Sequence, residues 1–177
     1  MYISIAKLET EFGSIYVAGS KKGVVMVDLG SPSLVVFRER LKKHVRCIGT
    51  NEVIIKDDDG LLDDSIKQLA DYLGGKRRKF SVSLVLIGTT FQKRVWMECS
   101  KIGFGETITY KELAKNIGNP GAARAVGAAL AANPVPIFIP CHRVVGSRGN
   151  PGGFSAGIDR KIALLDIEKS YLPLVAK

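Results

Sequence analysis

Residues 104–145 read FGETITYKELAKNIGNPGAARAVGAALAANPVPIFIPCHRVV, and this run predicts how the second half of the chain folds. Its apolar spacing predicts a helix over residues 109–117. The triplet Gly118-Asn119-Pro120 ends that helix, and a second helix is expected over residues 121–132. Two short helices joined by a tight turn that contains glycine are typical of a helix-turn-helix unit.

The second predicted helix, GAARAVGAALAA, has an unsuitable composition for reading base sequence. A helix in the major groove needs several long polar side chains, and this one offers only Arg124. Its small residues instead let the backbone come close to a partner, which suits a narrow groove bound through shape and phosphates. Close packing inside a protein core is the alternative interpretation.

The segment that follows, residues 133–143, places a cysteine on a restricted backbone, because Pro140 directly precedes Cys141. A thiol is mostly protonated at neutral pH and needs a base to become a nucleophile, and His142 is its neighbour. Adjacent side chains of an extended chain point to opposite sides, so we expect a bridging water between His142 and the Cys141 sulfur. A purely structural role for this pair is the alternative.

The first half of the chain has clear strand and helix patterns but no recognisable chemistry. The expected elements are three strands within residues 1–30, a helix starting at 31–33, a strand at 53–55 and a helix over 62–73. The basic run 76–79 is interpreted as a solvated charge cluster, with a DNA contact as the alternative. After a linker at 87–88, Thr89 or Thr90 is expected to cap a further helix. We predict an α/β domain over residues 1–86 and a mainly helical domain over residues 87–177.

The charge of the chain favours an anionic partner. Its 177 residues carry a net charge of +9, and after position 88 there are 12 basic against 6 acidic residues. The basic excess therefore lies mainly in the second half, which points to nucleic acid without proving it.

The cysteines and the apolar pattern favour an intracellular protein. Cys47, Cys99 and Cys141 are an odd number without close pairing, which argues against a disulfide framework. His44 and Cys47 could share one side of a helix, but two ligands do not make a zinc site, so no metal is expected. No signal peptide and no apolar run long enough to span a membrane is found in the sequence.

Taken together, these motifs closely resemble the O6-alkylguanine-DNA alkyltransferase family. The resemblance covers the second domain in nearly unbroken register, whereas the first domain shares only the general strand-helix pattern. The matching residues are 104–106, Tyr110, 118–120, 122–127, 133–136, 139–145, 164–165 and Glu168.

The resemblance implies a ribonuclease H-like first domain and a second domain with a winged-helix/helix-turn-helix fold. It implies direct-reversal repair, in which an alkyl group, chiefly methyl, moves irreversibly from O6 of guanine in DNA to Cys141, once per molecule. No cofactor is implied. The implied partner is double-stranded DNA, bound through the minor groove with little sequence preference by a cytoplasmic monomer.

The resemblance also implies the catalytic roles of individual residues. Cys141 would be the nucleophile, His142 would take its proton through water, and Glu168 would orient His142. Tyr110 would donate its phenolic hydrogen to N3 of the departing guanine. Arg124 would enter the duplex in place of the flipped nucleotide.

A further set of residues would hold the DNA and the base. Ser155 would bond O6, the carbonyls of Cys141 and Val144 would recognise the exocyclic amine, and Asn133 would tie the second helix to the cysteine segment. The remaining members of this expected set are Ala123, Phe154 and Ala156.

Two members of this set depart from the family pattern. Phe154 stands where the family often has tyrosine, which removes a phenolic hydrogen bond but leaves stacking possible. Ala156 stands where many members have glycine, and we expect its methyl group to narrow the base pocket.

Other functions explain fewer of these residues. A non-enzymatic winged-helix sensor of alkylated DNA would lack an acceptor such as Cys141. A winged-helix regulator with a buried core cysteine would not account for Tyr110, Arg124, His142 and Glu168 together. A cysteine hydrolase would normally have its base in direct contact with the sulfur.

Overall fold

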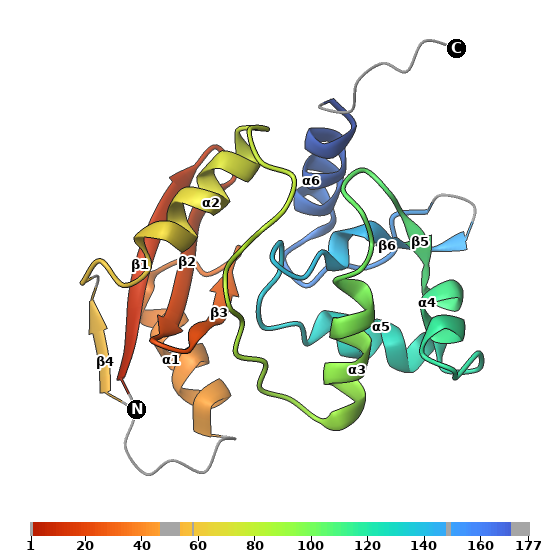
Figure 1. The fold of residues 1–177 in the computed structure, drawn as a ribbon, viewed down its shortest axis with the longest axis horizontal. Helices are drawn as coiled ribbons and strands as arrows, with labels where there is room; N and C mark the ends of the chain where they lie inside the picture. The colour runs from red at the N-terminus through yellow and green to blue at the C-terminus, as the bar shows by residue number, and fades with distance from the viewer. Residues whose placement is uncertain (1, 47–53, 58, 148–149, 171–177) are drawn as a thin grey trace.

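The computed structural model describes residues 2–46, 54–57, 59–147 and 150–170. The first domain is built on a four-stranded sheet in the order β3-β2-β1-β4 (Figure 1). The antiparallel strands are β1 (Tyr2–Thr10), β2 (Gly13–Ser20) and β3 (Gly23–Asp28), and β4 (Ile54–Asp57) runs parallel to β1. This confirms the three strands predicted within residues 1–30 and a strand beginning near residue 54.

Side-chain alternation along the strands divides the sheet into two apolar faces. Helix α1 (Leu34–Val45), capped by Ser33, covers one face, and helix α2 (Asp63–Leu73) covers the other. The buried strand residues facing α1 are Ile3, Ile5, Tyr16, Ala18 and Val25. Those on the α2 side are Ala6, Ile15, Val17, Val24 and Val27. Cys47, which we considered as a metal ligand with His44, lies outside the described residues.

The second domain contains helices α3 (Thr90–Cys99), α4 (Tyr110–Asn116), α5 (Ala123–Ala131) and α6 (Ile158–Ser170). A short 3-10 helix η2 (Cys141–Arg143) lies between α5 and β6 (Val144–Val145) in the chain, and β6 pairs in parallel with β5 (Ile108–Thr109), which precedes α4. The helix-turn-helix prediction corresponds to α4 and α5. Thr89 caps α3 and Thr109 caps α4, each in a reciprocal capping box.

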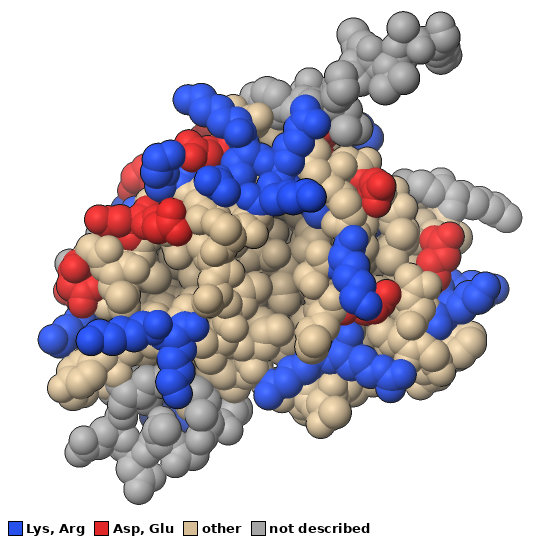
Figure 2. All heavy atoms as spheres, viewed as in Figure 1, with Lys and Arg blue, Asp and Glu red and all other residues tan. Residues whose placement is uncertain are grey.

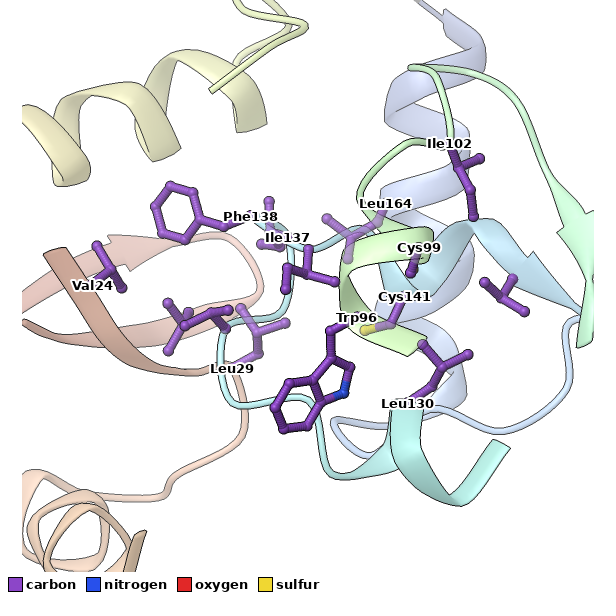
Figure 3. Close-up of a cluster of buried hydrophobic side chains, with 14 of the residues drawn as sticks. Val24, Leu29, Trp96, Cys99, Ile102, Leu130, Ile137, Phe138, Cys141 and Leu164 are labelled. Atoms are coloured by element: carbon purple, nitrogen blue, oxygen red, sulfur yellow. The ribbon is translucent and has the colours of Figure 1, made fainter. Parts of the chain in front are cut away.

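One apolar core joins the two halves of the chain. Leu29, which directly follows β3, Trp96 from α3 and Leu164 from α6 belong to the same buried cluster (Figure 3). The indole of Trp96 donates to the carbonyl of Ala129 in α5 at 2.7 Å, and Val27 N donates to Pro134 O at 2.8 Å. The cysteine segment is therefore fixed against both the helices and the sheet.

The surface carries its positive charge in more than one place. On the face shown in Figure 2, basic side chains gather around the upper ends of α2 and α6 and again along the lower edge near α3. None of the helices in the described ranges is long and apolar enough to cross a membrane.

Candidate active site

A cavity of about 590 Å³ opens over Cys141. Its wall combines the first residue of α4, one side of α5, the cysteine of η2 and the loop before α6. Six of the predicted site residues are among its lining: Tyr110, Ala123, Arg124, Cys141, Phe154 and Ser155. Gly127, Leu130, Ala131 and Gly153 complete it.

Cys141 lies at the inner end of this cavity, within the core drawn in Figure 3. Its sulfur accepts a hydrogen bond from Nδ2 of Asn133 at 3.2 Å. The same amide nitrogen donates to the carbonyl of Ile139 at 3.1 Å, and Asn133 Oδ1 accepts from Val135 N at 3.1 Å. Asn133, which comes after the C-cap residue of α5, thus joins the end of that helix to the cysteine segment.

The backbone that leads to Cys141 is strained at one position. Ile137 is buried and has φ = 75°, a left-handed conformation that is rare for a β-branched residue. Such a residue costs of order 1–3 kcal/mol and persists only where its surroundings hold it. The packing of Ile137 in the common core provides that restraint, so the cysteine segment has little freedom to move.

Cys141, His142 and Arg143 form a turn of 3-10 helix, so the predicted extended backbone at this point is wrong. Pro140 restricts the entry, and the N–H of Arg143 bonds to its carbonyl at 2.9 Å, which closes the turn. His142 is fully buried, and its Nε2 lies 2.8 Å from Oε1 of Glu168.

The hydrogen bonds of Glu168 determine the tautomer of His142. Burial alone would raise the pKa of Glu168, but hydrogen bonds from His142 and Arg143 outweigh it and lower that pKa to about 2. A carboxylate only accepts hydrogen bonds, so it favours the tautomer of His142 in which Nε2 carries the proton. Its Nδ1 is then a free acceptor, and it is buried without a hydrogen-bond partner among the described residues.

Further donors hold the Glu168 carboxylate in place. Arg143 reaches it through Nε at 3.0 and 3.1 Å and through Nη2 at 2.8 Å. The backbone N–H of Gly105 donates to Oε2 at 2.8 Å, and the hydroxyl of Tyr72 donates to Oε1 at 2.5 Å. The Phe104-Gly105-Glu106 turn therefore contributes a backbone donor to the site.

Lys161 is a site residue that the sequence analysis missed. It is fully buried, and its Nζ donates to the carbonyl of Val144 at 2.5 Å. Burial lowers the pKa of Lys161, and the opposing effect of negative charge on the Cys141 sulfur does not offset it. The signal was present in the spacing, because Lys161, Leu164 and Glu168 occupy one buried face of α6.

Two opposing influences act on the thiol itself. Burial raises the pKa of Cys141, and the Asn133 hydrogen bond and the positive charge of Lys161 lower it. The net direction is upward, so the thiol stays protonated until a base removes its proton.

Tyr110 stands at the first position of α4 and faces the loop before α6. Its hydroxyl donates to the carbonyl of Gly153 at 3.3 Å, and burial and then Cys141 raise the pKa of Tyr110. Gly152 has φ = 71°, and a β-carbon there would lie 2.9 Å from the Tyr110 hydroxyl oxygen. Glycine at this position lets the loop approach the phenol.

Five predicted residues do not line the cavity over Cys141: His142, Glu168 and Asn133, whose contacts are given above, and Val144 and Ala156. Val144 is buried, and the described contact of its carbonyl is with Lys161. Ala156 lines a neighbouring cavity of about 490 Å³ together with Asn133 and Asp28, and it is not among the residues that line the cavity over Cys141. Ala156 is therefore next to the Cys141 cavity in sequence, through Ser155, which lines both cavities.

Family models and known proteins match the chain over nearly its whole length. Residues 2–86 match the model "6-O-methylguanine DNA methyltransferase, ribonuclease-like domain", and residues 90–170 match "6-O-methylguanine DNA methyltransferase, DNA binding domain".

Among curated relatives, the methylated-DNA–protein-cysteine methyltransferase of Mycobacterium tuberculosis is 49% identical over 116 residues, covering 66% of this chain and 70% of the relative. The inducible enzyme of that name from Bacillus subtilis is 40% identical over 156 residues, covering 88% and 84%. The one from Methanosarcina acetivorans is 39% identical over 170 residues, covering 96% and 99%.

Solved structures agree with this match. The O6-methylguanine methyltransferase of M. tuberculosis superposes with a TM-score of 0.82 at 35% identity, covering 97% of this chain and 96% of the other. The M. tuberculosis OGT in complex with DNA gives a TM-score of 0.79 at 36% identity, covering 98% and 96%. The chain belongs to the 6-O-methylguanine DNA methyltransferase family.

Proposed function

We propose that this protein repairs DNA by direct reversal and that Cys141 accepts the alkyl group, chiefly methyl, from O6 of guanine in one irreversible transfer. The observation that carries the assignment is the position of the sulfur, at the inner end of a cavity of a size typical of ligand sites and next to the His142–Glu168 pair. The names of the relatives support the same reaction.

The transfer begins with removal of the thiol proton. Nδ1 of His142 is the available base, and it takes the proton of Cys141 through a water molecule, while Glu168 stabilises the imidazolium that forms. The thiolate attacks the alkyl carbon in line with its bond to O6. A new S–C bond forms, the C–O bond breaks, and its electron pair passes to the guanine.

The leaving base is neutralised by Tyr110. Its hydroxyl stays protonated because burial raises the pKa of this phenol, so it can supply a proton to N3 of the departing guanine. Solvent then carries the proton of the His142 imidazolium to the Tyr110 phenolate, so that in the net reaction the proton lost by the thiol ends on the guanine. The thioether left on Cys141 has no hydrolytic route among the groups of the cavity. Each molecule therefore acts once.

The base is held by the loop before α6 and by the turn that contains Cys141. Ser155, exposed at the cavity wall, donates to O6, and the carbonyls of Cys141 and Val144 accept from the exocyclic amine. The contact between Val144 and Lys161 permits this role, because a carbonyl oxygen has two lone pairs. Phe154 stacks on the flipped base.

The partner is double-stranded DNA, entered through the minor groove by α5 with little sequence preference. Arg124, Ala125 and Ala128 are exposed on this helix, so its outer face offers methyl groups for close approach and one long cation. Arg124 takes the place of the flipped nucleotide. We further propose that the protein acts as a cytoplasmic monomer, with residues 1–86 and 87–177 as its two domains.

The decisive experiment is incubation with a duplex carrying one O6-methylguanine, followed by mass spectrometry of the cysteine peptides. We expect one methyl group on the Cys141 peptide, none on the buried Cys99, and a plateau at one group per protein under excess substrate. Cys141→Ser should abolish transfer and keep DNA binding. Wild-type protein that binds the lesion without transferring it would instead support a non-enzymatic sensor.

A further inference from the structure

Tyr72, in α2 of the first domain, reaches the His142–Glu168 pair of the second domain. It is fully buried, and its hydroxyl lies 2.5 Å from Oε1 of Glu168 and 3.2 Å from Nε2 of His142. Its ring packs against Phe80 and Phe104, with centroid distances of 5.2 and 6.1 Å. Phenylalanine would fill the same space, so ring packing alone does not explain the hydroxyl.

The direction of these hydrogen bonds follows from the charges. Burial and then the Glu168 carboxylate raise the pKa of Tyr72. The phenol therefore stays protonated and donates a hydrogen bond to Oε1 of Glu168. The lone pairs of the phenol oxygen are then left for Nε2–H of His142. The hydroxyl thus bonds both members of the pair.

This arrangement favours one tautomer of His142 over the other. If the proton moved to Nδ1, Nε2 would become an acceptor that faces the Glu168 carboxylate, which is also an acceptor. The phenol of Tyr72 has one hydrogen, so it could donate to Nε2 or to the carboxylate but not to both. With the proton on Nε2, all three groups are satisfied, and Nδ1 keeps the lone pair that the thiol of Cys141 requires.

We propose that Tyr72 is a positioning residue for thiol activation, through which the first domain takes part in the chemistry of the second. The proposal rests on the proposed function, in which His142 is the base for Cys141. Tyr72 does not touch the substrate or the sulfur. It holds Glu168 and His142 in the orientation and tautomer that proton transfer needs.

The test compares Tyr72→Phe with Tyr16→Phe, which removes a buried phenol hydroxyl from the opposite face of the same sheet. Single-turnover transfer from an O6-methylguanine duplex should slow roughly tenfold in Tyr72→Phe at neutral pH and stay unchanged in Tyr16→Phe. The loss should shrink from about pH 7 to about pH 9, as the solvent ionises more of the thiol without a relay. DNA affinity should not change.

Nitrogen-15 NMR gives a second readout that packing alone would not move. The chain has two histidines, so the His142 ring can be assigned with His44 as internal reference. We expect the Nε2–H tautomer in wild type and a mixture of tautomers in Tyr72→Phe. The proposal fails if Tyr72→Phe keeps both the wild-type tautomer and the wild-type transfer rate. It also fails if the loss of transfer rate in Tyr72→Phe is the same at every pH.

A His142→Ala arm separates this inference from the proposed function. If His142→Ala transfers alkyl groups at the wild-type rate, the base assignment itself fails. If His142→Ala is slow while Tyr72→Phe is normal, only the role of Tyr72 fails. If both assignments hold, adding Tyr72→Phe to His142→Ala should cost little further rate, since residues of one relay are not additive.

Discussion

At the scale of single residues, Lys161 and Asn133 counteract the effect of burial on the Cys141 thiol. The sulfur has lost most of its contact with water, which disfavours the thiolate. The amide of Asn133 donates directly to the sulfur, and the ammonium of Lys161 contributes positive charge nearby. These two groups thus oppose the effect of the apolar core, which would otherwise make the proposed nucleophile unreactive.

Lys161→Met should therefore slow alkyl transfer and move its pH dependence upward. Removing the cation takes away one of the influences that lower the pKa of Cys141, and a pKa higher by one unit leaves roughly tenfold less thiolate at neutral pH. The rate of Cys141 alkylation by iodoacetamide across a pH series measures this without DNA. An unchanged midpoint would show that Lys161 serves only as a donor to the carbonyls of Val144 and Gly153.

The loop before α6 gives a prediction about pocket size. Phe154 lines the Cys141 cavity, whereas Ala156 lines the neighbouring one. Ala156→Gly should accordingly change the rate constants for O6-methylguanine DNA and free O6-benzylguanine by the same factor. Phe154→Ala should lower the benzyl rate roughly tenfold through lost aromatic contact. If the ratio of the benzyl to the methyl rate constant rises in Ala156→Gly, the methyl group of Ala156 does narrow the base pocket.

At the scale of helices and strands, local patterns predicted most elements correctly. Thr89 and Thr109 begin their helices in capping boxes, with Gln92 and Glu112 three residues later. The pairing of β4 with β1 is parallel and joins distant segments, so no short pattern could have specified it. The 3-10 turn at Cys141 was also missed, because the predicted extended chain took no account of the packing that shapes this segment.

The candidate site was predictable where its residues share a motif and unpredictable where the fold brings them together. Cys141, His142 and Tyr110 belong to the motif-rich second half, where Cys141 and Tyr110 line one cavity and His142 contacts Glu168. Tyr72 comes from another domain and looks in the sequence like one more apolar residue of α2. Its contact with Glu168 spans 96 positions, and only the tertiary structure reveals it.

Helix α5 gives a prediction that separates base flipping from chemistry. Arg124 is exposed and also lines the cavity, so it can act on the duplex without touching the sulfur. Arg124→Ala should slow repair of O6-methylguanine in a duplex at least tenfold, because flipping costs a few kcal/mol of unstacking. Its reaction with free O6-benzylguanine should stay near the wild-type rate.

Measuring both rate constants in both proteins tests this role of Arg124. Equal losses on the two substrates would place the residue in the chemistry or the fold instead. Lys93→Ala, a change of one exposed cation on the neighbouring helix α3, is a suitable control for general loss of positive charge.

At the scale of the whole molecule, the two halves are joined by an apolar core and by the polar network around Glu168. Its carboxylate accepts from Tyr72 in α2, from Arg143 in η2 and from the turn at Gly105. Removing one member of a buried network strands the others without partners, which costs more than the lost bond. Glu168 therefore contributes to stability, in addition to the role proposed for it in the reaction.

The pKa of Glu168 turns this arrangement into a prediction about acid stability. Its value of about 2, against an ordinary 4.5, means that the carboxylate stabilises the folded state above about pH 4.5 and loses this effect as the pH falls toward 2. A difference of this size corresponds to about 3 kcal/mol. The free energy of unfolding of wild type should fall by about 3 kcal/mol more between about pH 5 and pH 2 than that of Glu168→Gln.

Denaturant unfolding followed by fluorescence of Trp96, the one tryptophan of the chain, measures this difference, because its ring lies in the core common to both halves. Glu11→Gln, which removes an exposed carboxylate from the first domain, should follow the wild-type curve. Glu168→Gln should start less stable at neutral pH, since an amide cannot accept from all the surrounding donors, and then depend less on pH. If the free energy of unfolding depends on pH in the same way in wild type and in Glu168→Gln, the Glu168 carboxylate orients His142 but does not stabilise the contact between the two halves.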